Sequence, residues 1–463
     1  MSKDEERRGG TPRDIDEVLS QYLSAVKADP RNAALHHDLG VVYMEKGDHR
    51  DAIAAFEQAL VLQPDLTNAR HLLAVALAEL GELDKAQRNW EKVVEREPNH
   101  SRALYFLGWV HTASGHWDKA IELLDRAAEI PPVSPKVYHT LAEAHVGKGD
   151  AEGAIEIWKR IIADDPDDLR AQHNLCAAYL DAGRYEECIG AAREAIKKGS
   201  KSTVPRTNAA LALLVLGELD EAERFMREAI QMDPSDTRAR VNLGEILARR
   251  GDLDGAEQEW AGVLDDEPQN PDAHFNLGQA AYIRDDLEAA LGRWSDGLEA
   301  VEEAPEALRE YYSDRFHTVR AAVLQESGDY ERAIEEQLKV SGSQDPASRY
   351  YRAALVALEA GWKDRCRDLL EKARKAAPRG HLGTTFARGA LQLKEGDHVG
   401  GARQWRLVLE SEPDAALVVR PHVGRLFSPQ ELDDIARDLS DAGYDDEHRA
   451  VRTYRTALLP EEG

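Results

Sequence analysis

The stretch TRARVNLGEILARRGDLDGAEQEWAGVLDDEPQN fills residues 237–270 and predicts two amphipathic helices, because its apolar residues return at three- and four-residue steps. Gly251-Asp252 separates the two helices, since glycine tolerates the positive φ that closes a first helix. Pro268 ends the second helix, because proline can neither donate a backbone hydrogen bond nor fit inside a helix. The stretch therefore predicts a helix-turn-helix unit of 34 residues.

This pattern returns every 34 residues, with small residues at positions 8 and 20, an aromatic residue near position 24 and proline at position 32. The small residues let the two helices of a unit approach closely. Eight units follow without a break, and they start at Ala33, Thr67, Ser101, Pro135, Leu169, Thr203, Thr237 and Pro271. After the segment PEALREYYS, three more units start at Asp314, near Ala347 and at Leu382.

The pattern resembles the tetratricopeptide repeat family, and the eight copies in one register make the resemblance specific. It covers about four-fifths of the chain. The resemblance implies an all-α fold, a right-handed superhelical solenoid of about eleven helix-turn-helix repeats with capping helices at both ends. Residues 33–304 would form repeats 1–8 and residues 314–415 repeats 9–11. The insertion at residues 305–313 either lengthens a helix and bends the array into two sub-arrays or acts as a binding loop.

Both ends of the chain predict caps, because a terminal repeat would otherwise expose an apolar face. Residues 1–13 are expected to be disordered, and residues 14–32 to form a capping helix closed by Pro30. Residues 416–463 are expected to hold the C-terminal capping helices, and Ser428-Pro429-Gln430-Glu431 is a good helix start. A degenerate twelfth repeat fits this last helix and the one expected near residues 445–458.

The composition indicates a folded protein with a strongly acidic surface. Among 463 residues, 59 Lys and Arg stand against 86 Asp and Glu, a formal charge of −27. Such a surface repels phosphate backbones and anionic membranes, so we expect no nucleic-acid partner. A basic partner and simple solubility both account for the charge. The opening MSKDEERRGG has no apolar core, and no apolar run is long enough to span a bilayer, which predicts a cytoplasmic protein without direct membrane insertion.

Asparagine stands at position 6 of four consecutive repeats: Asn174, Asn208, Asn242 and Asn276, here called the asparagine ladder. Positions 7 and 8 of a first helix pack inward, whereas position 6 lies on the side that lines the concave groove in the resembled family. One side-chain amide offers both a donor and an acceptor, so it can pair with the backbone of an extended peptide. The ladder resembles that of O-linked N-acetylglucosamine transferases, which implies the same grip on a peptide. Alternatively, the four residues are inherited from the family's average repeat.

Position 2 supplies a basic stripe on the same side, and its members are Arg102, Lys136, Arg170, Arg238 and Arg315. The stripe either meets acidic side chains of a ligand or pairs with nearby acids such as Glu143, Asp181 and Glu245. Of these basic residues, Arg170 and Arg238 are predicted partner-binding residues.

The third repeat carries Tyr105, Phe106 and Trp109 at positions 5, 6 and 9. Aromatic side chains dominate binding hot spots, so this aromatic cluster predicts an anchor pocket for a partner. Packing onto a neighbouring helix is the alternative.

No constellation in the sequence predicts catalysis, a cofactor or a metal site. Position 5 is histidine four times, at His37, His71, His139 and His173, but ligands one repeat apart do not converge on one ion, and hydrogen bonding in the groove is the better interpretation. No zinc-protease, nucleotide-phosphate, dinucleotide or esterase motif occurs. The lysine and asparagine with which some repeats clamp the terminal carboxylate of heat-shock chaperones are absent from positions 5 and 9.

The three cysteines stand at small-residue positions, Cys176 at position 8 and Cys188 and Cys366 at position 20. Positions 8 and 20 of one repeat touch, so Cys176 and Cys188 should be neighbours. Replacement of alanine explains them, and a redox switch is the alternative.

These features predict a non-catalytic scaffold or adaptor that binds an extended segment or helix of one or more partner proteins in its groove. A dedicated chaperone or assembly factor for secretion, pilus or motility machinery is the second hypothesis. The third is a regulatory subunit of a separate catalytic chain. The sequence does not identify the partner or the oligomeric state.

Overall fold

The computed structural model describes residues 15–341 and 345–458, and in this part of the chain it contains 27 helices and no strand. The all-α prediction is confirmed. The predicted disordered segment, residues 1–13, lies outside the described residues. The chain divides into two compact units, residues 1–235 and 236–463. The boundary between these units precedes residues 305–313, where a bend between two sub-arrays was expected. That bend stays a prediction.

Thirteen helices make up the described part of the first unit. They are α1 (Ile15–Ala28), α2 (Ala33–Lys46), α3 (His49–Leu62), α4 (Thr67–Glu79), α5 (Leu83–Arg96), α6 (Ser101–Ala113), α7 (Trp117–Ala128), α8 (Pro135–Lys148), α9 (Ala151–Asp164), α10 (Leu169–Asp181), α11 (Tyr185–Lys197), α12 (Val204–Leu216) and α13 (Leu219–Met232).

The second unit continues the series. Its helices are α14 (Thr237–Arg249), α15 (Leu253–Asp266), α16 (Pro271–Ile283), α17 (Leu287–Ala300), α18 (Glu306–Glu326), α19 (Tyr330–Lys339), α20 (Ser348–Glu359), α21 (Lys363–Ala376), α22 (Leu382–Glu395), α23 (His398–Ser411), α24 (Ala415–Val418), α25 (Arg420–Leu426), α26 (Pro429–Asp441) and α27 (Asp445–Ala457).

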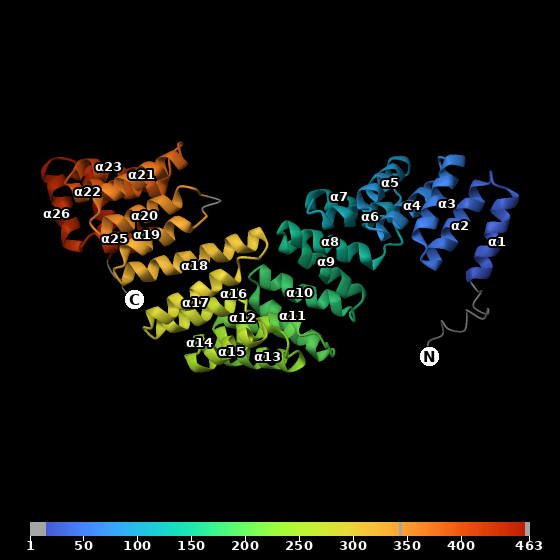
Figure 1. Cartoon of the computed structure of the whole chain (residues 1–463), viewed down its shortest axis with the longest axis horizontal. Coiled ribbons are helices and arrows are strands. Elements are labelled where there is room, and N and C mark those ends of the chain that lie inside the picture. Colours follow the sequence, from blue (N-terminus) through green and yellow to red (C-terminus); the bar gives the residue numbers. More distant parts are fainter. Residues whose placement is uncertain (1–14, 342–344, 459–463) are drawn as a thin grey trace. The chain divides into compact units, whose positions relative to one another are not determined.

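Within each unit, helices that follow one another in the sequence pack side by side, from α1 to α13 and from α14 to α24 (Figure 1). The first helix of a repeat begins at or within one residue of the predicted start in repeats 1 to 8. Glycines close many of these helices with positive φ, for example Gly251 at 89°. In the eighth repeat Asp285 takes that place with a φ of 63°. The helix-turn-helix interpretation of the repeat is confirmed.

The insertion continues as helix. Residues 306–313 form the first turns of α18, which has 21 residues where the other first helices have 12 to 14. At the C-terminal end, Ser428 and Glu431 form the capping box that starts α26. The short helices α24 and α25 were not predicted, because four and seven residues are too few for a helical period to show. Among the described residues, no helix has the length and apolar character to cross a bilayer.

Large side chains at position 24 pack on position 8 of the same repeat. The glycines there have no room for a methyl group: a Cβ on Gly40 would lie 2.5 Å from Phe56, and one on Gly108 would lie 2.5 Å from Leu124. In the eighth repeat a Cβ on Gly278 would overlap the indole nitrogen of Trp294. Position 8 is therefore small because the second helix inserts a ring or branched side chain against it.

Glycine at position 8 also lets the tryptophan at position 24 satisfy its N–H. Trp260, Trp294 and Trp405 face a glycine and donate to the carbonyl at position 5 of their repeats, at 3.0, 3.1 and 3.1 Å. Trp90 and Trp158 face an alanine, and their buried indole nitrogens have no hydrogen-bond partner among the described residues. In these five repeats the indole hydrogen bond therefore goes together with glycine at position 8.

Side chains at position 4 join one repeat to the one before. His274 donates from Nε2 to the carbonyl of Pro268 at 2.9 Å, and His36 donates likewise to Pro30 at 3.1 Å. A helix that ends at proline leaves carbonyl groups without helical partners, and these bonds satisfy one of them. This role of position 4 was not predicted from the sequence, because the residues there differ from repeat to repeat.

Substituting Gly278→Ala is expected to lower the free energy of unfolding by about 2 kcal/mol, because the new methyl group displaces Trp294 and breaks its hydrogen bond to Phe275. Urea unfolding followed by circular dichroism measures the change. The control is Gly292→Ala on α17, an exposed glycine whose Cβ would meet no atom within 4 Å. There the better helix propensity of alanine should leave stability unchanged or slightly higher. Equal effects of the two substitutions would contradict the packing argument.

Candidate partner-binding surface

The four ladder asparagines lie on first helices, on α10 and α12 of the first unit and on α14 and α16 of the second. Each is followed by two buried residues at positions 7 and 8, such as Leu243 and Gly244 after Asn242. All four are partly exposed, and none of their side-chain amides makes a hydrogen bond with a described residue. The Nδ2 atom of Asn208 is itself buried and has no hydrogen-bond partner in the described part of the chain. The side-chain donors and acceptors of the ladder therefore form no hydrogen bonds within the described part of the fold.

The arginines beside the ladder differ in their surroundings. Arg170 forms an ion pair with Glu143, one of the acids predicted to neutralise the stripe. Arg238 is exposed and makes no ion pair with a described residue. Arg315 of the same stripe bonds to Asp272 at 2.8 Å and lies over the ring of Phe275, 3.6 Å from its centroid. Pairing within the fold therefore explains Arg170 and Arg315 but not Arg238.

The three members of the aromatic cluster differ in their packing. Phe106 stacks on Trp90 of the preceding repeat, with centroids 4.9 Å apart and planes 5° from parallel. Tyr105 meets Phe106 edge-on at 5.1 Å, and both rings pack against the core of the first unit. Trp109 is 37% exposed. The alternative interpretation, packing onto a neighbouring helix, holds for Phe106, and Trp109 is the member that stays open to a partner.

The position-5 histidines act inside the fold. His71 and His139 are buried, so the prediction that they face the groove is wrong for these two. His139 bonds to Asp168 at 2.8 Å, and His173 to Ser200 at 2.7 Å. Burial, with a smaller effect of His100, lowers the pKa of His71 to about 4. Among the described residues, no group of three or more His, Cys, Asp or Glu side chains is placed to hold a metal ion.

Family models match several parts of the chain. Models described as tetratricopeptide repeat match residues 33–66, 71–135, 213–274 and 259–305. A model described as anaphase-promoting complex, cyclosome, subunit 3, matches residues 147–229. The chain belongs to the tetratricopeptide repeat family. No curated protein matches the sequence.

Solved structures similar to this tetratricopeptide repeat protein have 15 to 21% sequence identity to it over the matched parts. MamA has 21% identity and a TM-score of 0.33, and the match covers 35% of this chain and 95% of MamA. Yeast Tom70 has 15% identity and a TM-score of 0.42, and the match covers 82% of this chain and 91% of Tom70. The human IFIT1 dimer with m7Gppp-AAAA has 15% identity and a TM-score of 0.43, and the match covers 86% of this chain and 95% of the IFIT1 chain.

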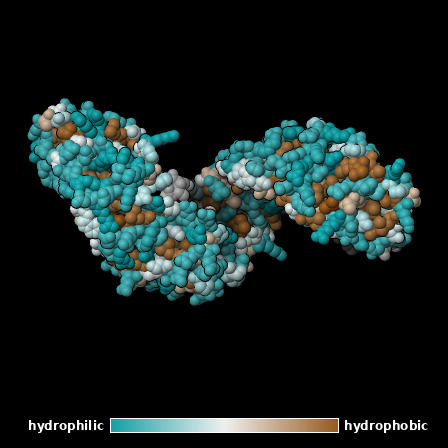
Figure 2. Space-filling view, turned by 45° about the horizontal axis from the view of Figure 1, so that its top comes forward, coloured by the Kyte–Doolittle hydropathy of each residue, from teal (hydrophilic) through white to brown (hydrophobic). Residues whose placement is uncertain are grey.

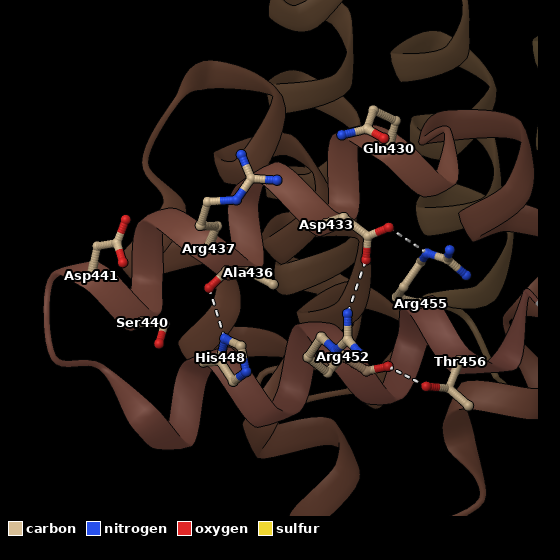
Figure 3. Close-up of a pocket in the computed structure, with 10 residues that line it drawn as sticks. All are labelled: Gln430, Asp433, Ala436, Arg437, Ser440, Asp441, His448, Arg452, Arg455 and Thr456. Carbon is tan, nitrogen blue, oxygen red and sulfur yellow. Dashed lines mark hydrogen bonds and ion pairs between the residues drawn. The ribbon is translucent and has the colours of Figure 1, made fainter.

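The surface of this tetratricopeptide repeat protein shows hydrophobic side chains in separate patches within a mostly hydrophilic face (Figure 2). At the C-terminal end, α26 and α27 leave a hollow of about 520 Å³ between them. Figure 3 shows that Asp433 accepts from both Arg452 and Arg455, and that His448 bonds to the carbonyl of Ala436. These charges satisfy one another, so the hollow is a polar end face of the kind that terminates a repeat array.

The buried carboxylate of Glu336 joins α18 to α19. It accepts from His317 at 2.6 Å, from Arg320 at 3.2 Å and from Lys339 at 3.1 Å. Burial alone would raise the pKa of Glu336, but the hydrogen bonds from His317 and Arg320 outweigh it and lower the pKa to about 2. Three cationic or polar partners around one buried carboxylate make this a structural cluster of the fold.

The thiols of Cys176 and Cys188 are neighbours, as predicted, with their sulfur atoms 3.3 Å apart. Both cysteines are fully buried and free, as is Cys366. The hydrogen bond from Cys176, together with burial, raises the pKa of Cys188 well above its usual range, and burial raises that of Cys366 to about 12. Protonated, buried thiols are poor nucleophiles.

Substituting Glu336→Gln is expected to cost about 3 kcal/mol at neutral pH, because Arg320 and Lys339 lose their buried anion. A depressed carboxyl pKa contributes stability that is complete above about 4.5 and disappears as the pH falls toward 2. Urea unfolding at several pH values should therefore show that the free energy of unfolding of the wild type falls in this interval, and that the free energy of the variant falls less. Parallel pH profiles for the two proteins would refute this account.

All three thiols are expected to resist an aromatic disulfide reagent in the native protein and to react once urea unfolds it, because none is exposed. Thiol counting on protein purified without reductant checks this. The loss of two thiols together from unfolded, oxidised protein would instead favour the redox switch at Cys176 and Cys188.

Proposed function

We propose that this tetratricopeptide repeat protein is a non-catalytic scaffold that grips an extended segment of a partner protein with the asparagine ladder. The observation that supports the proposal is that four amides at one repeat position are partly exposed and form no hydrogen bond with a described residue. A polar group that is half-buried without a partner costs stability unless a ligand or water satisfies it. An extended peptide presents N–H and C=O groups that such amides can pair with.

The two units contribute two asparagines each, in consecutive repeats. Asn174 and Asn208 lie on α10 and α12, helices that touch each other. Asn242 and Asn276 lie on α14 and α16, which also touch. Each pair can therefore act on one continuous stretch of peptide. Because amides bond to backbone atoms, the ladder accepts many sequences, and exposed side chains such as Arg238 and Trp109 would supply selectivity.

A protein partner suits the charge of the molecule better than a nucleic acid. A formal charge of −27 opposes the approach of a phosphate backbone, whereas a polypeptide can present either sign. Free cysteines are typical of reducing compartments, and the cytoplasm remains the proposed location.

Changing all four ladder asparagines to alanine is expected to weaken the dominant partner by at least about 100-fold, since each lost hydrogen bond costs roughly 1 kcal/mol. Affinity capture from native lysate, quantified by mass spectrometry, identifies the partner, and titration of that partner gives the dissociation constant. Circular dichroism verifies that the variant stays helical.

The matched control removes exposed amides from second helices: Gln58→Ala on α3, Gln231→Ala on α13 and Gln258→Ala on α15. These changes should leave partner binding unaffected. Survival of every partner in the folded ladder variant would mean that the asparagines are inherited background and would sink the proposal.

A further inference from the structure

A second candidate site lies in the second unit, between the lengthened helix α18 and helix α20. Both helices line a pocket of about 670 Å³, together with Val340 and Asp345 from between α19 and α20. A volume in this range suits one or two large side chains of a bound ligand. None of the ladder asparagines lines it.

The insertion builds one wall of this pocket. Ala307, Glu310 and Tyr311 belong to the extra first turns of α18 and line the pocket together with Thr318 and Val319 further along the helix. Spacings of three, four and seven residues place side chains on one face of a helix. Tyr311 is 61% exposed although it lines the pocket. Without the insertion the pocket would lose its aromatic side.

Most charged groups of the pocket already have partners in the fold. Asp314 accepts from the amide and the hydroxyl of Ser341, both at 2.7 Å. Asp345 bonds to His381 at 2.8 Å and also to Ser348. Arg315 bonds to Asp272, as described above. These groups therefore give the pocket its shape and leave little charge to offer a ligand.

Arg352 is different, because it lines the pocket, is partly buried and makes no hydrogen bond or ion pair with a described residue. Its charge acts instead on His422, whose pKa is lowered by burial and by the neighbouring Arg425 and Arg352. A partly buried guanidinium group without a partner gains most from a carboxylate, which it can bind through two parallel hydrogen bonds. Glu310, at the insertion wall, also lacks a partner among the described residues.

We propose that this pocket binds a short segment of a partner protein that carries an aromatic or branched apolar side chain next to an aspartate or glutamate. The apolar side chain would lie against Tyr311, Val319 and Val340, and the carboxylate would pair with Arg352. Buried aromatic anchors combined with an arginine are typical of binding hot spots. The site is separate from the ladder and does not depend on it, and it makes the insertion a binding element.

The experiment is a selection of random peptides displayed on phage, with the full-length protein as bait and Arg352→Glu/Tyr311→Ala protein as counter-selection. We expect enriched peptides to share an apolar residue adjacent to Asp or Glu. Selection on Arg352→Glu alone should shift the charged position to Lys or Arg, because reversing one partner of an ion pair reverses the preference. One enriched peptide should bind Arg352→Glu at least about tenfold more weakly than wild type in fluorescence anisotropy.

Leu308→Ala is the matched control, because Leu308 lies in the same extra turns, is 53% exposed and does not line the pocket. It should select the same peptides as wild type, and so should the variant without ladder asparagines, which separates failure of this site from failure of the ladder. The proposal is overturned if no peptide survives the counter-selection, if surviving peptides lack an acidic residue, or if Arg352→Glu selects the same motif as wild type. Circular dichroism confirms that each bait is helical, and Tyr311→Ala, which changes an exposed side chain, tests the site should Arg352→Glu not fold.

Discussion

The contact between position 8 of the first helix and position 24 of the second is the constraint on which each repeat depends. A ring such as Phe56 or Trp294 occupies the space where a side chain on Gly40 or Gly278 would stand. This contact sets the distance between the two helices, and the rotation of the first helix follows from it, because positions 7 and 8 must both face inward. Position 6 is then left at the margin of the core. The ladder asparagines are partly exposed for this reason, whatever they bind.

Much of this could be predicted from the sequence, because a strict period of 34 residues carries the register from one repeat to the next. The start of α16 at Pro271 and the capping box at Ser428 depend on local residues, and local residues are what a sequence displays. The vicinity of Cys176 and Cys188 followed from the register alone. Contacts between repeats were harder to predict, since they depend on the size and polarity of the side chains that adjacent repeats place opposite each other.

Phe106 and His71 illustrate this limit. Both stand at positions that face the groove in the family's average repeat. Phe106 nevertheless stacks on Trp90, and His71 is buried with its ring centroid 5.7 Å from that of Phe106. A large side chain at position 6 can fold back over the preceding repeat, where it finds more apolar surface than in solvent. Asparagine is too short and too polar to gain from such packing. The repeat position therefore indicates a face, and the size and polarity of the residue decide whether it stays there.

The insertion adds helical turns to α18, which still packs against α17 and α19. Extra residues inside a second helix or a turn would displace every later repeat, whereas extra turns at the start of a first helix extend past the core and leave the position 8 contact untouched. Residues 306–313 follow this rule, since the core residue Phe316 of α18 packs against Gly297 and Phe275 while Tyr311 stays exposed. Lengthening α18 therefore adds surface next to the arginines at Arg315 and Arg352 at little cost to packing. The added turns both support the fold, through the Tyr312 hydroxyl that donates to Asp272 at 2.8 Å, and add exposed side chains, since Leu308 and Tyr311 remain more than half exposed. The recognition role proposed for the pocket depends on the exposed side of these turns.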